Sequence, residues 1–139
     1  MDLLKLAALD ADDLGVISAH MQDAVLKVGD LRFLKKAKKF ALAANRFVWE
    51  REAEPQRRET ALHFERVLSA KSHRVTMGDP AAVLSLLSID FAPAEEPSGT
   101  VVLNLSGGGA IRLEVECIEA QMQDLGPAWD TAKAPSHDR

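Results

Sequence analysis

Strict alternation of apolar and polar residues on both sides of a glycine cluster constrains the fold of this chain more than any other feature. Residues 100–118, "TVVLNLSGGGAIRLEVECI", place apolar side chains at every second position before and after Gly107, Gly108 and Gly109. A period of two is typical of strands with one buried face, and glycine supplies the positive φ angles of a tight turn. The segment therefore predicts an antiparallel hairpin, and with it an antiparallel sheet.

The same glycines do not form a phosphate-binding loop. Such a loop joins a strand to a helix, so that the helix N-terminus meets the phosphate, and its Walker form continues with Lys and then Ser or Thr. Here Ala110, Ile111 and Arg112 follow the glycines, and a strand pattern replaces the helix. The cluster therefore gives no support for a nucleotide-binding enzyme.

Five further segments favour strands, and loops rich in charge, glycine or proline separate them. The predicted strands span 3–9, 25–34, 39–50, 59–70 and 81–92. The last of these is so apolar that a short helix also fits it, although its flanking loops favour a strand. The basic turn "KKAKK" joins the second and third strands as a hairpin, and the predicted loops are 51–58, 71–80 and 93–99.

Two segments change to a helical period. Residues 11–23 place Leu14, Ile17 and Met21 on one helix face, after an aspartate that is suited to N-capping. Near the other end of the chain, "EAQMQDLGPAWD" predicts a short helix that its Gly-Pro pair terminates. The stretches "ISAHMQDA" and "IEAQMQDL" are similar, which means either two related helices docked on one sheet or a chance similarity.

Together these elements predict a single α+β domain over residues 1–129, followed by a flexible C-terminal tail at 130–139. The sheet is expected to be largely antiparallel, curved or closed into a barrel of six or seven strands, and accompanied by two helices. The nearest architectural analogy is a pleckstrin-homology-like barrel capped by its last helix, and an analogy of fold supplies no function. A chain of 139 residues is long enough to bury one core of its own.

Composition places the chain among ordinary globular proteins, with 47% hydrophobic and 27% charged residues. No apolar run approaches the roughly 20 residues of a membrane span, and the first residues lack a signal-peptide pattern, so we expect a cytoplasmic protein without a membrane partner. Cys117 is the single cysteine, and the four histidines lack the spacing of a helical zinc site. The sequence therefore predicts no disulfide, no metal and no other cofactor.

The net charge of −4 conceals a basic centre. Residues 26–75 carry 13 Lys and Arg against 6 Asp and Glu, whereas both flanking segments are acidic. Clustered basic residues gain affinity for polyanions by releasing counterions from phosphates. The other interpretation is that the acidic and basic segments neutralise each other in the fold, and a pI near 5.5 favours it over a nucleic-acid binder.

The segment "NRFVWE" (45–50) is the best candidate for a binding site. Arg and Trp dominate binding hot spots and stack well on flat rings, so Arg46 and Trp49 are the leading candidates. Three further arginines are expected close by, namely Arg57, Arg58 and Arg66. The alternative is structural, with the two aromatic residues of the segment in the core and Arg46 paired with Glu50 or Glu65.

His63 is the candidate for acid/base chemistry. It lies two residues before Glu65 in a predicted strand, so both side chains share one face, where a carboxylate can tune a histidine as a switch or a base. The alternative is a solvent-facing strand histidine with a charged neighbour. The sequence assigns no residue as catalytic.

Three longer stretches, "ISAHMQDAVLKVGDL", "KKFALAANRFVWE" and "IRLEVECIEAQMQDLGPAW", resemble domain of unknown function 2948, a family of short alphaproteobacterial proteins. The resemblance covers about residues 3–129. It implies no activity, substrate or cofactor, and it supplies no catalytic residues.

The sequence therefore favours a non-enzymatic cytoplasmic binding or protein-interaction module that uses Arg46, Trp49 and the arginines of 57–66. The alternative is a small enzyme that acts on an anionic metabolite through His63 and Glu65, and a second alternative is a weak nucleic-acid binder. The expected partner is a protein or an anionic small molecule, and pairing of two copies as a homodimer stays open.

Overall fold

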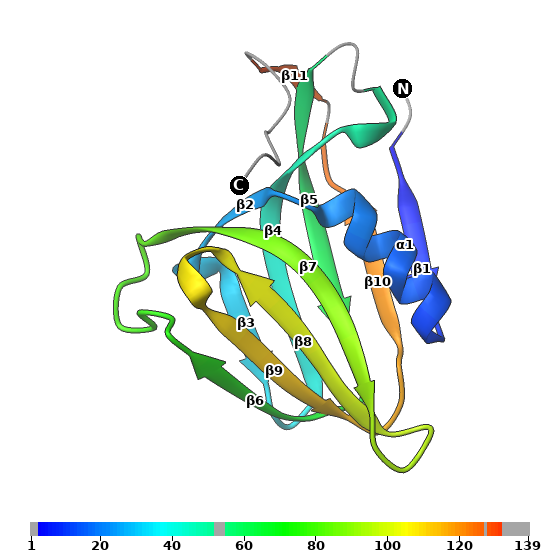
Figure 1. Ribbon diagram of the computed structural model, residues 1–139. Coiled ribbons are helices and arrows are strands. Elements are labelled where there is room, and N and C mark those ends of the chain that lie inside the picture. Colours follow the sequence, from blue (N-terminus) through cyan, green and yellow to red (C-terminus); the bar gives the residue numbers. More distant parts are fainter. Residues whose placement is uncertain (1–2, 52–54, 127, 132–139) are drawn as a thin grey trace.

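The computed structural model describes residues 3–51, 55–126 and 128–131 (Figure 1). In this part of the chain one α-helix, α1 (Ala11–Met21), accompanies a sheet of eleven strands, so the predicted counts of six or seven strands and two helices are wrong. The strands are β1 (Lys5–Ala8), β2 (Ala24–Lys27), β3 (Leu31–Leu34), β4 (Lys39–Phe47), β5 (Gln56–Phe64), β6 (Val67–His73), β7 (Val83–Pro93), β8 (Gly99–Leu105), β9 (Ala110–Val115), β10 (Ala120–Asp124) and β11 (Trp129–Asp130). Three short 3-10 turns lie between them: η1 (Val28–Asp30), η2 (Trp49–Arg51) and η3 (Ser106–Gly108).

The sheet folds over on itself around the long strand β4. The hydrogen-bonded order is β1-β10-β5-β4-β2-β7-β8-β9-β6, with β3 attached to β4 and β11 to β5, and the pairs are antiparallel. β3 pairs with the first half of β4, whereas β2 pairs with its second half through Val25 and Asn45. The half β1-β10-β5-β4-β3 therefore faces the half β2-β7-β8-β9-β6, and Figure 1 shows β7, β8 and β9 in front of β4.

The hydrophobic core lies between these two halves. Residues directly opposite each other in antiparallel strands point to the same face of the sheet. The inward side chains of neighbouring strands therefore form rows across the sheet. Buried side chains come from both halves, among them Leu42, Leu62, Met122, Leu86, Leu103 and Leu113. Burial of each large apolar side chain contributes roughly 1.5–3 kcal/mol, so these rows hold the two halves together.

The helix predicted for residues 11–23 is confirmed as α1, and it covers the gap between β1 and β7 (Figure 1). Its buried face is the predicted one, with Leu14, Ile17 and Met21. β2 pairs with β7 only as far as Leu86, and from there the hydroxyl of Ser18 accepts a hydrogen bond of 2.8 Å from the backbone of Ile89. Helix α1 thus covers the part of the β7 edge that β2 does not pair with. Among the described residues no helix is long and apolar enough to span a membrane.

The glycine hairpin is confirmed. β8 and β9 pair on either side of η3, where Gly107 and Gly108 have φ angles of 77° and 78°. The backbone N–H of Leu105 donates to the carbonyl of Gly109 over 2.8 Å and closes the turn. Positive φ at two successive positions explains why glycine is required there.

The predicted C-terminal helix is wrong. Its segment forms β10, which lies between β1 and β5. Ala120, Met122 and Asp124 point inward and Gln121 and Gln123 point outward, so the segment also satisfies a period of two. Pairing with a strand on each side outweighs the local helical preference. The similarity of this segment to part of α1 is therefore not a structural repeat.

The predicted strand at 59–70 consists of two strands, β5 and β6, joined by a tight turn. Arg66 adopts a φ of 60° in this turn, a left-handed conformation that is uncommon outside glycine and asparagine. The turn resets the alternation, so Val67 is buried and Leu68 is exposed. Other boundaries differ as well. β5 begins within the predicted loop 51–58, and β6 extends into the loop 71–80. η1 splits the predicted strand 25–34 into β2 and β3, and the predicted strand 39–50 ends at Phe47, before η2.

The sheet is curved but open, so the closed, pleckstrin-homology-like barrel capped by a last helix is wrong. β1 and β6 end the hydrogen-bonded order, and the ladders of the described residues do not join them. The turn between β3 and β4 reaches the start of β6, where the backbone N–H of Val67 donates to the Lys38 carbonyl over 2.9 Å. Most of the predicted tail, residues 132–139, lies outside the described residues.

Candidate functional site

Arg46, the leading candidate from the sequence, points into the protein. It follows Ala44 on the inward side of β4 and is 0% exposed. Its Nε and Nη2 donate to Asp124 over 2.8 and 2.9 Å, and its Nη1 and Nη2 donate to Glu50 over 3.0 and 2.8 Å. Nη1 also reaches the Phe47 carbonyl at 3.4 Å. The five N–H donors of this guanidinium are therefore all engaged inside the protein.

The carboxylate of Asp124 accepts hydrogen bonds from residues on several elements. Besides Arg46, its carboxylate accepts bonds from the Thr60 hydroxyl at 2.8 Å, the Leu4 backbone N–H at 2.9 Å and the Arg58 guanidinium at 3.4 Å. Burial alone would raise the pKa of Asp124, but the hydrogen bonds, that of Arg46 first, lower it to about 2. Both carboxyl oxygens are thus saturated by donors that hold the group in its charged form.

The charges in this part of the core are balanced. Burial disfavours the charge of Arg46, yet its bonds to Asp124 and Glu50 raise the pKa of its guanidinium above the ordinary value. Burial likewise opposes ionisation of Glu50, and its bonds to Arg46 lower its pKa nonetheless. We call these five side chains the Asp124 cluster: Arg46, Glu50, Arg58, Thr60 and Asp124.

Trp49 lies beside the Asp124 cluster and is half-buried. Its indole N–H donates to the Gln22 carbonyl over 2.9 Å, and its ring packs edge-on against Phe47 with the centroids 4.6 Å apart. The pairing of Arg46 with Glu50 matches the structural alternative for this segment. An external ligand would reach Arg46 only by breaking buried ion pairs, so the cluster acts first as an element of stability.

The remaining predicted arginines lie in other places. Arg57 points to the opposite side of β5 from Arg58, and its guanidinium donates to the carbonyls of Asn45 at 3.0 Å and Asp23 at 3.3 Å. Burial lowers the pKa of Arg57, and the charge of Asp23 opposes that effect. Arg66 occupies the turn after β5 with 59% of its side chain exposed, 3.5 Å from Glu119. The structure thus brings Arg46 and Arg58 together and separates Arg57 and Arg66 from them.

His63 lies on the outward side of β5. Its Nδ1 is 2.9 Å from Glu65, as the shared strand face predicts, and its Nε2 is 3.1 Å from the side-chain oxygen of Gln121 on β10. Glu65 also lies 3.6 Å from the ammonium of Lys39. Both ring nitrogens therefore have protein partners, and the imidazole is held in place by neighbours on two strands.

Around His63, many outward positions of the sheet are occupied by alanine. Ala43 stands opposite Ala61, and Ala41 stands opposite His63, which itself stands opposite Gln121. Such short side chains leave the strand backbones close to the surface. We call this surface the alanine face, made of Ala7, Ala41, Ala43, Ala61, His63 and Gln121.

Two grooves border the alanine face. One, of about 320 Å³, lies where β2 and β3 part from β4, and its polar lining consists of Lys27, Asp30, Asn45 and Glu59. The other, of about 240 Å³, runs along β1, β10 and β5, and its polar lining consists of His63, Glu65, Glu119 and Gln121. Ala43 lines the first groove and Ala7 the second, so the alanine face continues into both.

Sequence reasoning missed Asp124 and Gln121, because a helix was expected where β10 lies. It also missed the alanines, although "FALAAN" (40–45) carries Ala41 and Ala43 at every second position. Within the described ranges, no three His, Cys, Asp or Glu side chains are grouped so that they would hold a metal ion.

Fold and surface together define the class of protein. It is an open, antiparallel, sheet-rich protein with one covering helix. It has a buried arginine–carboxylate cluster and an outward face lined with alanine. Residues 4–137 match the family described as "Protein of unknown function (DUF2948)". The chain belongs to this DUF2948 family, and the resemblance seen in its sequence is confirmed. No curated protein and no solved structure matches the chain.

Proposed function

We propose that this chain is a non-enzymatic protein-interaction module that binds a protein partner through the alanine face. The observation that carries the proposal is the placement of four alanines at outward strand positions. Alanine is disfavoured in strands, where solvated positions usually carry β-branched, aromatic or long polar side chains. Folding gains little from alanine there, whereas a partner gains a flat surface that it can approach closely.

The charges along the two grooves favour a protein over a phosphate-bearing ligand. Glu59 lines the first groove, and Glu65 and Glu119 line the second. Carboxylates repel phosphates, so these grooves disfavour a nucleic acid or an anionic metabolite. A protein surface with mixed polar and small side chains suits them better.

The surroundings of His63 support binding rather than catalysis. A general base needs a ring nitrogen within hydrogen-bond reach of its substrate. In His63 one nitrogen contacts Glu65 and the other contacts Gln121. The side chain is therefore suited to fix the shape of the face, with the pair of Glu65 and Gln121 as its supports.

The proposal is tested by blocking the alanine face with one long side chain. Partners are captured from the cells that make the protein, purified, and titrated against the wild type, Ala61→Arg and Val102→Arg. Val102 is the matched control because it points outward on β8, on the other half of the sheet. Circular dichroism first establishes that both variants are folded.

We expect Ala61→Arg to weaken the Kd at least about tenfold, which corresponds to about 1.4 kcal/mol, and Val102→Arg to leave it unchanged. Equal binding by all three proteins contradicts the proposal. So does an anionic metabolite that raises the melting temperature in the wild type but not in His63→Ala, because that result favours the enzyme alternative.

A further inference from the structure

An open seam separates the two halves of the sheet on the side away from α1. It lies between β3 and β6, and at one end the Val67 N–H of β6 donates over 2.9 Å to the carbonyl of Lys38 in the turn that joins β3 to β4. Beyond that contact, the described residues of β3 pair with β4 alone and those of β6 with β9 alone. The seam is independent of the alanine face, which lies on the outward side of β1, β10, β5 and β4.

The seam opens onto the hydrophobic core. A cavity of about 130 Å³ lies along it, lined mainly by apolar side chains: Leu31, Phe33, Phe40, Ala70, Met77 and Ile111. Met77 is 49% exposed at this place, and Leu34 and Leu68, near the contact end of the seam, are exposed to a similar extent. Side chains of an added strand would alternate between this cavity and solvent, because successive residues of a strand point to opposite faces.

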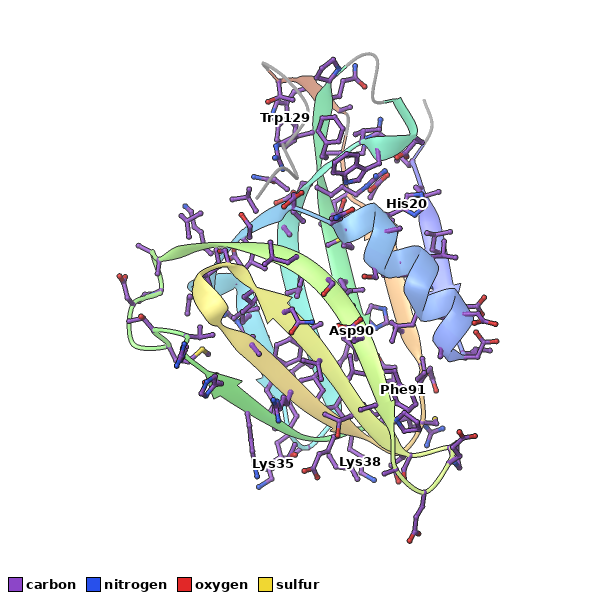
Figure 2. All side chains as sticks on the ribbon, viewed as in Figure 1. His20, Lys35, Lys38, Asp90, Phe91 and Trp129 are labelled. Carbon is purple, nitrogen blue, oxygen red and sulfur yellow. The ribbon has the colours of Figure 1, made fainter. Side chains whose placement is uncertain are left out.

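The two borders of the seam carry basic charge and lack acidic residues. Residues 31–41 and 67–76 contain no Asp or Glu. Lys38 and Lys39 pair with Glu116 and Glu65, whereas Lys35 and Lys36 make no ion pair with any described residue. Figure 2 shows Lys35 and Lys38 at the turn between β3 and β4.

On the other border, Lys71 stands opposite Arg112 in the ladder of β6 and β9, and Arg74 follows the end of β6. All three side chains are exposed, and none makes an ion pair with a described residue. Two neighbouring cations without a carboxylate between them repel each other. An acidic partner would relieve that repulsion.

We propose that this seam binds an extended peptide segment of a partner protein, with apolar and acidic side chains in alternation. The segment adds as a strand to the free edge of β6, its apolar side chains cover the cavity at Phe33 and Met77, and its carboxylates meet Lys71 and Arg74. Backbone pairing supplies affinity in strand addition, and the alternating side chains supply specificity. A nucleic acid fits less well, because it has no peptide backbone that could continue the strand ladder along the free edge of β6.

The test uses a capped peptide of alternating valine and glutamate, titrated into isotope-labelled full-length protein and followed by NMR. Its controls are a valine–lysine peptide, a serine–glutamate peptide, a valine–glutamate peptide with N-methylated backbone, and a single-stranded deoxythymidine oligonucleotide. The protein variants are Lys71→Glu and, as the matched control on the other end strand of the sheet, Lys5→Glu.

We expect the valine–glutamate peptide to bind with amide shifts concentrated in β3 and β6, and the three control peptides to bind at least about tenfold more weakly. Lys71→Glu should weaken binding about fivefold or more and Lys5→Glu should not. No saturable binding up to about 1 mM, shifts located elsewhere, or tighter binding of the oligonucleotide overturns the proposal. The lysines then serve to keep two strand edges from pairing with other chains.

Discussion

Arg46 of β4 and Asp124 of β10 hold each other inside the core through hydrogen bonds of 2.8 and 2.9 Å, although 78 residues separate them in the chain. Both side chains are 0% exposed. Removal of one partner from such a pair leaves the other as an uncompensated buried charge. Replacing either residue alone is therefore expected to destabilise the protein.

Asp124→Ala should lower the free energy of unfolding by about 3–5 kcal/mol, because Arg46 and Arg58 lose their shared acceptor. Urea denaturation measures the change. Gln123→Ala is the matched control, since Gln123 points outward on the same strand, and its effect should stay within about 0.5 kcal/mol. The double variant Arg46→Met with Asp124→Leu should be less destabilised than the sum of its single changes. Similar stabilities for Asp124→Ala and Gln123→Ala would show that the pair contributes little.

The same carboxylate predicts how stability falls in acid. The folded state holds the pKa of Asp124 at about 2, below its ordinary value of 3.8, mainly through the bonds from Arg46, Leu4 and Thr60. Because the folded value is the lower one, Asp124 contributes stability above pH 3.8, and the contribution, about 2 kcal/mol, disappears as the pH falls toward 2. Unfolding free energies measured between about pH 5 and pH 2 should fall less steeply in Asp124→Asn. An unchanged slope in that variant would assign the acid sensitivity to other groups.

Two glycines should respond differently to substitution. A Cβ at Gly99 would lie 2.5 Å from both the Phe91 ring and the Ala92 carbonyl, so Gly99→Ala should cost about 1–3 kcal/mol or more. At Gly107 no atom beyond its own chain neighbours lies within 4 Å of that position, and the cost arises from its φ of 77°. Gly107→Asn should therefore destabilise less than Gly107→Ala, because asparagine tolerates the left-handed region. Thermal unfolding of the three variants checks this order, and a Gly99→Ala protein as stable as wild type would contradict it.

Fluorescence can verify the environment of Trp49. The chain has two tryptophans, and Trp129 is 43% exposed at β11, where Figure 2 labels it. In Trp129→Phe the emission should come from Trp49 at shorter wavelength and with weaker quenching by iodide than in Trp49→Phe. The Trp49→Phe variant should also lose about 1 kcal/mol, because the hydrogen bond to the Gln22 carbonyl is removed. Equal quenching in both variants would place Trp49 in solvent.

Local chemistry accounts for the parts of the fold that could be predicted from the sequence. The carboxylate of Asp10 caps α1 by accepting the Asp13 N–H over 2.8 Å, and the apolar spacing defines the buried face of that helix. The hairpins around "KKAKK" and the three glycines follow from period two and turn chemistry. Each of these signals lies within a few residues of the structure that it specifies.

The remaining features depend on contacts between distant segments. β10 satisfies a helical and a strand period equally, and its position between β1 and β5 decides between them. Arg46 occurs in a segment whose Trp and Arg predict a surface site. Its buried partner, Asp124, comes from β10, far along the chain, and local sequence does not reveal it. The candidate site was thus predicted in part: His63 beside Glu65 was found, whereas the alanines opposite it have no chemical signature of their own.

The contact between Leu4 and Asp124 also bears on the order of events during synthesis. The Leu4 N–H donates to the Asp124 carboxylate, and the Asp124 N–H donates to the Leu4 carbonyl, across a separation of 120 residues. β1 pairs with β10 alone among the described strands, so it stays without a strand partner until β10 has left the ribosome. During synthesis β1 must therefore stay unpaired while the strands between it and β10 are made, and this edge of the sheet can form only after they have emerged.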